Sequence, residues 1–339
     1  MVKARRYVYK TAFDGEPKKT DLEIVEEELR PIKDGEFLCK AVYLSVDPYM
    51  RAYMSRYETG VTMIGGQVAE VIESKHKKYP VGRYVVGYFG WVDHVISDGK
   101  VQFSGAVTEV YLLPDFGKLP VSLGLGVLGM PGQTAYFGFL ELCQPKENET
   151  VVVSGAAGAV GSLVGQIAKI KKCHVVGIAG SDEKCKWLID EIGFDRAINY
   201  KTANFEKQLQ NAAPKGVDCY FDNVGGEISS TIIKNMNYRG RISVCGSISS
   251  YNDTHNNLSK ATVIQPFMIF KQLRMEGFIV HRWADRFGES TKEYLKWISE
   301  GKIKYRETVT NGFENMFEAF VGMLKGKNIG KAVVRAFPK

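Results

Sequence analysis

The sequence predicts an α/β protein that combines a β-rich part with a part built on a doubly wound parallel sheet. Three observations predict this class. A chain of 339 residues is long enough for two domains. A strand, a glycine-rich turn and a helix follow one another at 151–172. From about residue 128 onward, strand-like runs alternate with helical stretches, as in a parallel sheet covered by helices.

The β-rich part is expected over 1–127, with a return of the chain at 305–339. Its short apolar runs are interrupted by Pro, Gly and Asp, which is typical of strands joined by turns. These runs are Phe37–Leu44, Gln67–Ile72, Tyr84–Phe89 and Val107–Leu113. Lys331–Arg335 also has the pattern of a strand, so we expect the C-terminus to rejoin this part.

The second part is expected over 128–304, where six strand-like runs are separated by helical patterns. The strands are Val151–Val153, His174–Ala179, Ala197–Tyr200, Val217–Phe221, Arg241–Cys245 and Met275–Val280. The helical patterns lie near 159–172, 182–192, 203–212, 226–237 and 262–272. Six parallel strands with intervening helices form a doubly wound sheet.

The most informative stretch is 151–161, Val-Val-Val-Ser-Gly-Ala-Ala-Gly-Ala-Val-Gly. Three β-branched residues predict a buried strand, and the apolar residues of the following helix recur on one face. The glycines let the backbone approach a pyrophosphate, and the helix N-terminus offers it N–H groups and a positive dipole end. This order predicts a dinucleotide site in a cleft between the two parts. The alternative is an ordinary strand-to-helix turn without a ligand.

The end of the second strand favours NADPH over NADH. An acidic side chain there binds the ribose 2′-hydroxyl of NAD, whereas a basic one accommodates the extra phosphate of NADP. The strand ends Gly177-Ile-Ala-Gly180-Ser181 without a carboxylate, and Ser181, Lys184 and Lys186 can face a phosphate. Asp182 and Glu183 open the next helix, where acidic residues stabilise the N-terminus. The alternative for Lys184 is a solvated helix lysine.

No metal site is expected. A structural zinc needs four closely spaced cysteines, and a catalytic zinc needs Cys, His or Glu ligands. The five histidines are His76, His94, His174, His255 and His281, and the six cysteines are Cys39, Cys143, Cys173, Cys185, Cys219 and Cys245. They form no cluster in the sequence, so we expect reduced cysteines that are mostly core residues.

Composition and charge are typical of a soluble, cytoplasmic protein. The net charge of +7 suits an anionic cofactor or a carboxylate substrate, and the lysines are spread along the chain, so nucleic acid is not indicated. No window approaches the roughly 20 apolar residues of a membrane helix, and the N-terminus carries no cleavage signal. We therefore expect neither nucleic acid nor a membrane as a partner.

Five motifs resemble those of the zinc-free medium-chain dehydrogenase/reductases, and within them the prostaglandin reductase branch. They are Val46-Asp-Pro-Tyr-Met-Arg51, Met130-Pro-Gly-Gln-Thr-Ala-Tyr136, Gly158-Ala-Val-Gly161, Cys219-Tyr-Phe-Asp-Asn-Val-Gly-Gly226, and Gly312-Phe-Glu-Asn-Met316 with Met323-Leu-Lys-Gly326. Where zinc relatives carry Gly-His-Glu, this chain has Gly65-Gly66-Gln67. The resemblance covers essentially the whole chain. It implies a Rossmann domain over 128–304, a β-rich GroES-like catalytic (substrate) domain over 1–127 and 305–339, and a homodimer.

The resemblance also implies which residues bind NADPH. They fall into a pyrophosphate turn, a 2′-phosphate pocket, the loop 245–251 beside the cofactor, a strand beside the nicotinamide and one C-terminal asparagine. The implied contacts are Gly158, Ala159, Val160, Gly161, Lys184, Tyr200, Asn223, Cys245, Gly246, Ser247, Ile248, Ser249, Ser250, Tyr251, Phe278, Ile279, Val280 and Asn328.

The activity implied by the resemblance is NADPH-dependent reduction of the C=C bond of α,β-unsaturated ketones and aldehydes, as in a 15-oxo-prostaglandin 13-reductase or a 2-alkenal reductase. Hydride would add to the β-carbon of a lipid enone or enal. The resulting enolate would be stabilised by Tyr251 and the ribose hydroxyl of the cofactor. Tyr49 is expected either as a wall of the substrate pocket or as a packing aromatic.

Other activities remain open at this point. NADP-dependent oxidation of allylic alcohols of the leukotriene B4 type uses the same fold and cofactor. A quinone reductase of the zeta-crystallin type is the main enzymatic alternative. A cofactor- or RNA-binding relative without turnover is the alternative from another class.

Overall fold

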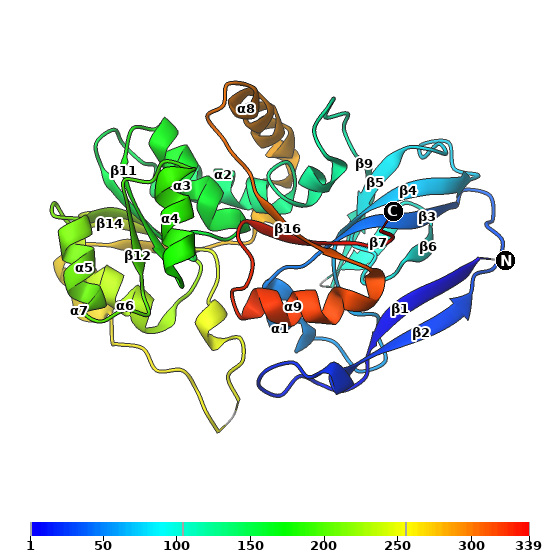
Figure 1. The fold of residues 1–339 in the computed structure, drawn as a ribbon, viewed down its shortest axis with the longest axis horizontal. Coiled ribbons are helices and arrows are strands. Elements are labelled where there is room, and N and C mark those ends of the chain that lie inside the picture. The colour runs from blue at the N-terminus through cyan, green and yellow to red at the C-terminus, as the bar shows by residue number, and fades with distance from the viewer. Residues whose placement is uncertain (1, 104, 255, 339) are drawn as a thin grey trace. The chain divides into compact units, whose positions relative to one another are not determined.

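The computed structural model describes residues 2–103, 105–254 and 256–338, which form two compact units (Figure 1). The first unit consists of Met1–Leu125 together with Glu307–Lys339, and the second of Gly126–Arg306. Each unit contains its own sheet and its own hydrophobic core. The chain therefore leaves the first unit, builds the second, and returns.

The first unit is β-rich and is built on a seven-stranded sheet of order β16-β17-β3-β4-β5-β9, with β6 paired to β3. Its strands are β3 Phe37–Ser45, β4 Gln67–Ser74, β5 Tyr84–Gly87, β6 His94–Ser97, β9 Tyr111–Leu112, β16 Glu307–Asn311 and β17 Lys331–Arg335. Because β17 pairs antiparallel with β3, the C-terminal segment rejoins the sheet of the N-terminal segment, as the sequence predicts.

Smaller elements complete the first unit. They are the strand pairs β1 Lys3–Tyr9 with β2 Leu22–Glu28 and β7 Lys100–Phe103 with β8 Ala106–Glu109, and the helices α1 Tyr49–Met54 and α9 Met316–Leu324. Side chains from α1, α9 and several strands share one buried apolar cluster. This cluster holds the first turn of α1, and therefore Tyr49, in a fixed place.

The second unit is a doubly wound sheet of six strands in the order β12-β11-β10-β13-β14-β15, and every neighbouring pair is parallel. The strands are β10 Thr150–Ser154, β11 His174–Ala179, β12 Arg196–Asn199, β13 Val217–Asp222, β14 Met236–Val244 and β15 Arg274–Gly277. In sequence order this is 3-2-1-4-5-6, the Rossmann arrangement, which places ligands at the carboxyl ends of the strands. The predicted fold class is confirmed.

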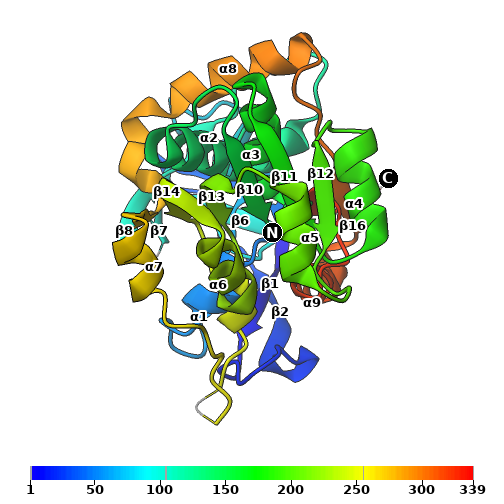
Figure 2. The ribbon, with the colours of Figure 1, turned by 90° about the vertical axis from the view of Figure 1, so that its left-hand side faces the viewer.

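Helices pack against this sheet as a doubly wound fold requires (Figure 2). They are α2 Met130–Cys143, α3 Ala159–Ile170, α4 Asp182–Asp190, α5 Phe205–Ala212, α6 Gly226–Lys234, α7 Gln265–Phe270 and α8 Phe287–Ser299. α2 contacts β13 and β14, α3 contacts β10 and β11, and α4 contacts β11 and β12. α3 is enclosed by this packing, with eight of its twelve residues buried.

Four elements of the second unit differ from the sequence prediction. The fifth strand, β14, begins at Met236 rather than at Arg241, and helix α8 lies in a stretch for which no helix was predicted. The sixth strand was expected over 275–280 but ends at Gly277, because its ladder with β14 ends where Val244 pairs with Gly277. Helix α2 is absent from the prediction because apolar residues surround it on all sides. Ten of its fourteen residues are buried, so no one-sided periodicity marks it.

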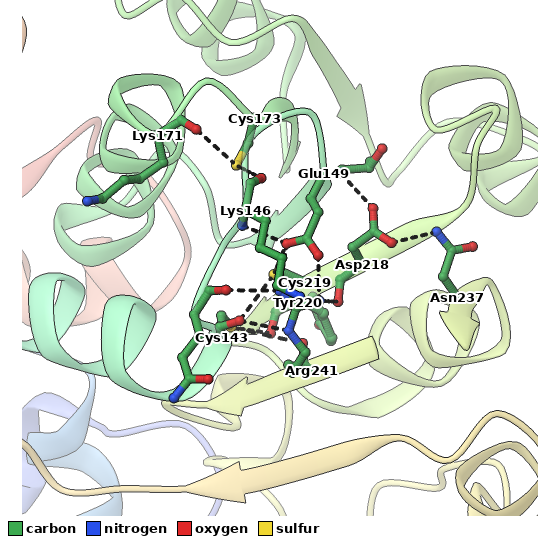
Figure 3. A network of polar contacts seen from close by, with 12 residues as sticks. Cys143, Lys146, Glu149, Lys171, Cys173, Asp218, Cys219, Tyr220, Asn237 and Arg241 are labelled. Atoms are coloured by element: carbon green, nitrogen blue, oxygen red, sulfur yellow. Dashed lines mark hydrogen bonds and ion pairs between the residues drawn. The ribbon is translucent and has the colours of Figure 1, made fainter. Parts of the chain in front are cut away.

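A polar clamp ties α2 to the amino ends of the sheet strands (Figure 3). The Arg241 guanidinium donates to both carboxylate oxygens of Glu149, at 3.0 and 2.6 Å, and to the carbonyl oxygens of Cys143, Gln144 and Asp218. Burial opposes ionisation of Glu149, but the Arg241 hydrogen bonds outweigh it and hold the pKa of this carboxyl below its usual value. These contacts occupy the donors of Arg241, so the clamp is structural.

The six cysteines are free thiols, and four of them, Cys39, Cys143, Cys173 and Cys219, are buried. Burial raises the pKa of Cys39 to about 12, so this thiol stays protonated at neutral pH. Across the described ranges, no helix is both long enough and apolar enough to cross a membrane.

Candidate active site

The glycine turn lies between β10 and α3, at the carboxyl end of a central strand. Gly155 has a φ of +59°, a conformation that favours glycine. A Cβ at Gly161 would lie 2.5 Å from the Gly155 carbonyl oxygen and 2.8 Å from Ala156 Cα, so α3 packs directly on the turn. Gly158 is the N-cap of α3, and no side chain caps the helix. The backbone N–H groups of Ala159 and Val160 in this first turn suit an anion.

Two lysines and a tyrosine gather beyond the ends of β11 and β12. Lys184 lies in the first turn of α4, where its N–H donates to the Ser181 hydroxyl at 3.3 Å. Burial lowers the pKa of the half-buried Lys184, and the charge of Lys201 lowers it further. The Lys201 ammonium lies 6.0 Å from the centroid of the Tyr200 ring, and Tyr200 Oη would contact a Cβ at Gly180 at 3.3 Å. The Lys184 and Lys201 ammonium groups repel each other, and a bound phosphate anion would relieve this repulsion.

The loop 245–251 follows β14 and ends in Tyr251. The backbone N–H of Ser247 donates to Tyr251 Oη at 3.2 Å, and this oxygen would lie 3.0 Å from a Cβ at Gly246. The hydroxyl groups of Ser247 and Ser250 lie 2.9 Å apart, and Ile248 and Ser249 form a short 3-10 turn with Ser250. The phenol is therefore folded back on the start of its own loop. A phenol that accepts an N–H keeps its O–H as a donor.

Cys245, at the start of this loop, is an unreactive thiol at neutral pH. Burial raises the pKa of its thiol to about 12, with a smaller contribution from the Asp222 carboxylate. The thiolate is the nucleophilic form of cysteine, and it is scarce at neutral pH when the pKa is this high. The loop therefore offers Tyr251, and not Cys245, as its acid–base group.

Asn223 joins the glycine turn to the Tyr251 loop. Its N–H donates to Ser154 Oγ at 3.0 Å, and its Nδ2 donates to the Ser154 carbonyl oxygen at 2.7 Å. Its Cβ would lie 3.3 Å from a Cβ at Gly155, and its carbonyl oxygen accepts from the Ile248 N–H at 3.3 Å. The structure thus brings together three of the predicted cofactor segments at neighbouring strand ends.

The residues Phe278, Ile279 and Val280 follow β15 and have different surroundings. Phe278 packs inside the unit, where its ring centroid is 5.6 Å from that of Trp283 and its atoms would collide with a Cβ at Gly138. Val280 is buried, whereas Ile279 is 59% exposed. Of these three side chains, Ile279 is the most exposed.

Tyr49 belongs to the first unit, in an aromatic group with Tyr53, Tyr88 and Phe103. The centroid of its ring lies 5.4 Å from that of Tyr53 and 5.9 Å from that of Phe103, and Tyr88 stacks on Phe103 at 4.2 Å. Its Oη is buried and has no hydrogen-bond partner among the residues described. Burial and then the Asp47 carboxylate raise the pKa of Tyr49 well above its ordinary value. A buried hydroxyl left without a partner is costly, which favours a ligand contact over simple packing.

The segment before Tyr49 is fixed by a buried ion pair. Lys331 Nζ donates to Asp47 Oδ1 at 2.6 Å and to the Val46 carbonyl oxygen at 2.8 Å, and the Ser45 hydroxyl donates to the same carboxylate. Lys331 is 3% exposed and Asp47 5% exposed. Breaking a buried pair by removing one partner leaves an uncompensated charge, so this pair holds the turn firmly.

Asn328 also belongs to the first unit, in the turn before β17. Its Nδ2 donates to the Gly330 carbonyl oxygen at 2.8 Å. Gln67, which stands in the Gly65-Gly66-Gln67 segment, donates from Nε2 to the carbonyl oxygens of Gly90 and Val92.

The possible metal ligands are scattered. No group of three or more His, Cys, Asp or Glu side chains that could hold a metal ion occurs within 2–103, 105–254 and 256–338. His255, one of the five histidines, lies outside the described residues. His94 Nδ1 lies 3.0 Å from a carboxylate oxygen of Asp93, and His174 Nδ1 lies 3.7 Å from a carboxylate oxygen of Asp195.

Sequence reasoning missed two residues of this site, Lys201 and Asp222. Lys201 follows directly after Tyr200, and a basic residue one strand away from Lys184 was a usable signal. Asp222 ends β13 inside the Cys219–Gly226 motif, and its side chain accepts several hydrogen bonds that no spacing reveals.

Comparisons with known proteins show the family to which the chain belongs. Residues 5–104 match the family described as the N-terminal domain of oxidoreductase, and residues 159–300 match the family described as zinc-binding dehydrogenase. The chain is 52% identical to prostaglandin reductase 1 of Oryctolagus cuniculus over 98% of this chain and 93% of the relative. It is 38% identical to the NADP(+)-dependent 2-alkenal reductase of Nicotiana tabacum over 98% and 97% of the two chains.

A solved structure extends the comparison to the fold. The crystal structure of CurA from Vibrio vulnificus in complex with NADPH matches with a TM-score of 0.90 at 40% identity, covering 99% of this chain and all of the other. Identity at this level over nearly the whole length shows common descent. The chain belongs to the zinc-independent medium-chain dehydrogenase/reductase superfamily, in the branch that contains prostaglandin reductase 1.

Proposed function

We propose that this protein reduces the C=C bond of α,β-unsaturated ketones and aldehydes with NADPH. The observation that carries the proposal is the position of Tyr251 in the loop 245–251, which follows β14. Asn223 links this loop to the glycine turn, because it accepts from the Ile248 N–H and donates to the Ser154 carbonyl oxygen. The relatives support it through their names, a prostaglandin reductase and a 2-alkenal reductase. The solved relative that binds NADPH supports the choice of cofactor.

The residues of the second unit fit NADPH. The close approach of Gly161 to the Gly155 carbonyl leaves no room for a side chain, which suits a turn that carries a pyrophosphate. We assign the 2′-phosphate to Lys184, Tyr200 and Lys201, because this is where two cations lie together. When bound, NADPH supplies a hydride to the β-carbon of the substrate.

Tyr251 acts on the negative charge that hydride addition creates. Electrons move from the C=C bond to the carbonyl oxygen, which becomes an enolate oxygen. The Tyr251 O–H donates a hydrogen bond to this oxygen, and the Ser247 N–H that points at Oη strengthens the phenol as a donor. Protonation of the α-carbon, by Tyr251 or by water, then gives the saturated carbonyl compound.

The aromatic group around Tyr49 suggests the kind of substrate. The Tyr49 ring packs against Tyr53 and Phe103, Tyr88 stacks on Phe103, and the Tyr49 hydroxyl has no partner among the described residues. We propose that this group receives the apolar part of a lipid enone or enal, and that Tyr49 Oη binds a polar atom of it. The first unit would then be the substrate domain and the second the cofactor domain.

Three further assignments complete the proposal. Asn328 reaches the cofactor from the C-terminal segment. The protein acts in the cytoplasm, whose reducing conditions suit six free thiols. It works as a homodimer, as the resemblance to its superfamily implies.

A substrate screen tests the proposed function. Oxidation of NADPH is followed with 2-alkenals, enones, a 15-oxo-prostaglandin and quinones, and the saturated aldehyde of equal length serves as the matched control. We expect turnover with the conjugated compounds and none with the saturated aldehyde. Turnover confined to quinones would replace the proposal with a quinone reductase.

A further inference from the structure

Asp222 is a buried carboxylate at the end of β13 that gathers five hydrogen bonds. The residue is 3% exposed. Its Oδ1 accepts from Tyr220 Oη at 2.7 Å and Ser154 Oγ at 3.1 Å, and its Oδ2 accepts from Ser229 Oγ at 2.7 Å. Oδ1 also accepts from two backbone N–H groups of the next loop. A buried charge is tolerated when hydrogen bonds surround it in this way.

The donors to Asp222 come from separate elements of the second unit. Ser154 ends β10 just before the glycine turn, and Ser229 lies in α6. Tyr220 is fully buried, and burial and then the Asp222 carboxylate raise the pKa of its phenol well above the ordinary value. Tyr220 therefore stays a donor at any physiological pH. One carboxylate thus joins the ends of β10, β13 and α6.

Asp222 also fixes the loop that follows it. Oδ1 accepts from the N–H groups of Val224 and Gly225, both at 2.9 Å. Gly225 has a φ of +73°, so the chain turns sharply there, and the two N–H groups converge on one oxygen. Removing the carboxylate would leave both N–H groups without this acceptor.

The same turn, at 222–225, is hydrogen-bonded to the loop 245–251 that ends in Tyr251. The Asp222 carbonyl oxygen accepts from the N–H groups of Cys245 and Gly246, at 2.8 and 3.1 Å. The Val224 carbonyl oxygen accepts from the Ser249 N–H at 3.0 Å and from its hydroxyl at 2.6 Å. Every step from the Asp222 carboxylate to the Tyr251 loop is therefore a hydrogen bond or a peptide bond.

From these contacts we infer that Asp222 is a positioning residue that holds Tyr251 in place for the reaction. The expected effect on kcat rests on the proposed function, whereas the positioning of the Tyr251 loop by Asp222 is independent of it. The Asp222 carboxylate is buried and acts through Val224, Gly225 and the loop 245–251. A misplacement of about 1 Å in such a group can cost about a hundredfold in rate.

A double-mutant cycle on kcat tests whether Asp222 acts through Tyr251. We expect Asp222→Ala to lower kcat about ten- to a hundredfold in the natural chain. In the Tyr251→Phe background the same substitution should change kcat little, because the group that it positions is gone. Equal losses in both backgrounds would show that Asp222 does not act through Tyr251.

Two further variants separate positioning from stability. Asp222→Asn keeps one acceptor oxygen for the loop N–H groups and should restore part of the lost kcat. In the same sheet, the buried Ser243 hydroxyl donates to the Gly138 carbonyl oxygen at 2.7 Å, and Gly138 does not belong to this loop. Ser243→Ala removes this hydroxyl. It should lower the melting temperature without changing kcat. A loss of kcat in Ser243→Ala as large as in Asp222→Ala would reduce the effect to general destabilisation.

Hydrogen exchange measures the positioning without any substrate. In Asp222→Ala, or in Asp222→Asn if the alanine variant does not fold, we expect faster amide exchange at Val224 and Gly225 and also across Ile248–Tyr251. Exchange across Ile248–Tyr251 that stays at the natural rate would overturn the inference. No turnover with any conjugated compound of the substrate screen would instead contradict the proposed function and would leave the exchange result unaffected, so the two failures are distinguishable.

Discussion

At the scale of single residues, we predict that Lys184, Tyr200 and Lys201, at the ends of β11 and β12, decide between the two nicotinamide cofactors. We expect Lys184→Ala to weaken NADPH binding about ten- to a hundredfold, since one charge-assisted phosphate contact contributes roughly 1.5–3 kcal/mol. NADH binding should not change. Lys186→Ala, an exposed lysine of the same helix, is the matched control. Fluorescence titration with both cofactors measures the effect, and an unchanged NADPH to NADH ratio would reduce Lys184 to a surface lysine.

The pKa of Lys184 predicts a pH dependence for the same pocket. Burial and Lys201 lower this pKa in the cofactor-free protein, and a bound phosphate would raise it again. At a pH at which Lys184 of the cofactor-free protein is deprotonated, NADPH binding therefore includes the uptake of one proton by Lys184. Affinity should be full while Lys184 is charged and should fall as the pH rises through its lowered pKa.

Titrations at increasing pH measure this decline for NADPH, with NADH and Lys184→Met as controls that should show a flatter profile. A decline of equal steepness in Lys184→Met would assign the pH dependence to another group.

Tyr251 gives the third prediction at this scale. Tyr251→Phe should lower kcat for enone reduction about tenfold to a hundredfold while the Kd of NADPH stays nearly constant. The lost hydrogen bond forms only as the enolate develops, so it affects the transition state more than the ground state. Tyr238→Phe, at a 59% exposed tyrosine of the same unit, is the control. A normal turnover number in a folded Tyr251→Phe protein would move the donor role elsewhere.

At the scale of elements, the sequence predicted the alternating strands and helices of the second unit well. β11 was predicted with its observed bounds, and α3 began at the predicted residue. The patterns worked there because each element is amphipathic or flanked by glycine turns. They failed for α2, which is apolar on all sides, and for the end of β15, which depends on where its partner β14 ends. They also missed α8 and the first residues of β14. Neither property is local in the sequence.

The glycine turn gives a prediction at this scale. Gly161→Ala should destabilise the fold by about 1–3 kcal/mol and weaken NADPH binding, because its Cβ would press on the backbone of Gly155 and Ala156. Gly158→Ala is the matched control for stability, since its Cβ would approach the same carbonyl only to 3.3 Å. Thermal melts and cofactor titration compare the two. Equal effects would show that the turn does not depend on this close contact.

At the scale of the whole molecule, the fold class and the family followed from motifs, whereas the site was predictable only in part. The glycine turn, Lys184 and Tyr251 lie in stretches with a recognisable pattern. Lys201 and Asp222 were missed because their roles arise from neighbours on other strands. Lys201 lowers the pKa of Lys184 from across two strand ends, and Asp222 collects donors that are up to 68 residues away in sequence. Such convergence is a property of the folded sheet.

The central claim is that hydride from NADPH reaches the β-carbon of a conjugated carbonyl compound. NADPH carrying deuterium at both C4 positions, supplied with a 2-alkenal in the presence of a metal chelator, tests it directly. Mass spectrometry and NMR of the product locate the label. The account predicts a saturated aldehyde with one deuterium on the β-carbon. Deuterium on the carbonyl carbon of an allylic alcohol, or no product until a metal ion is restored, would contradict it.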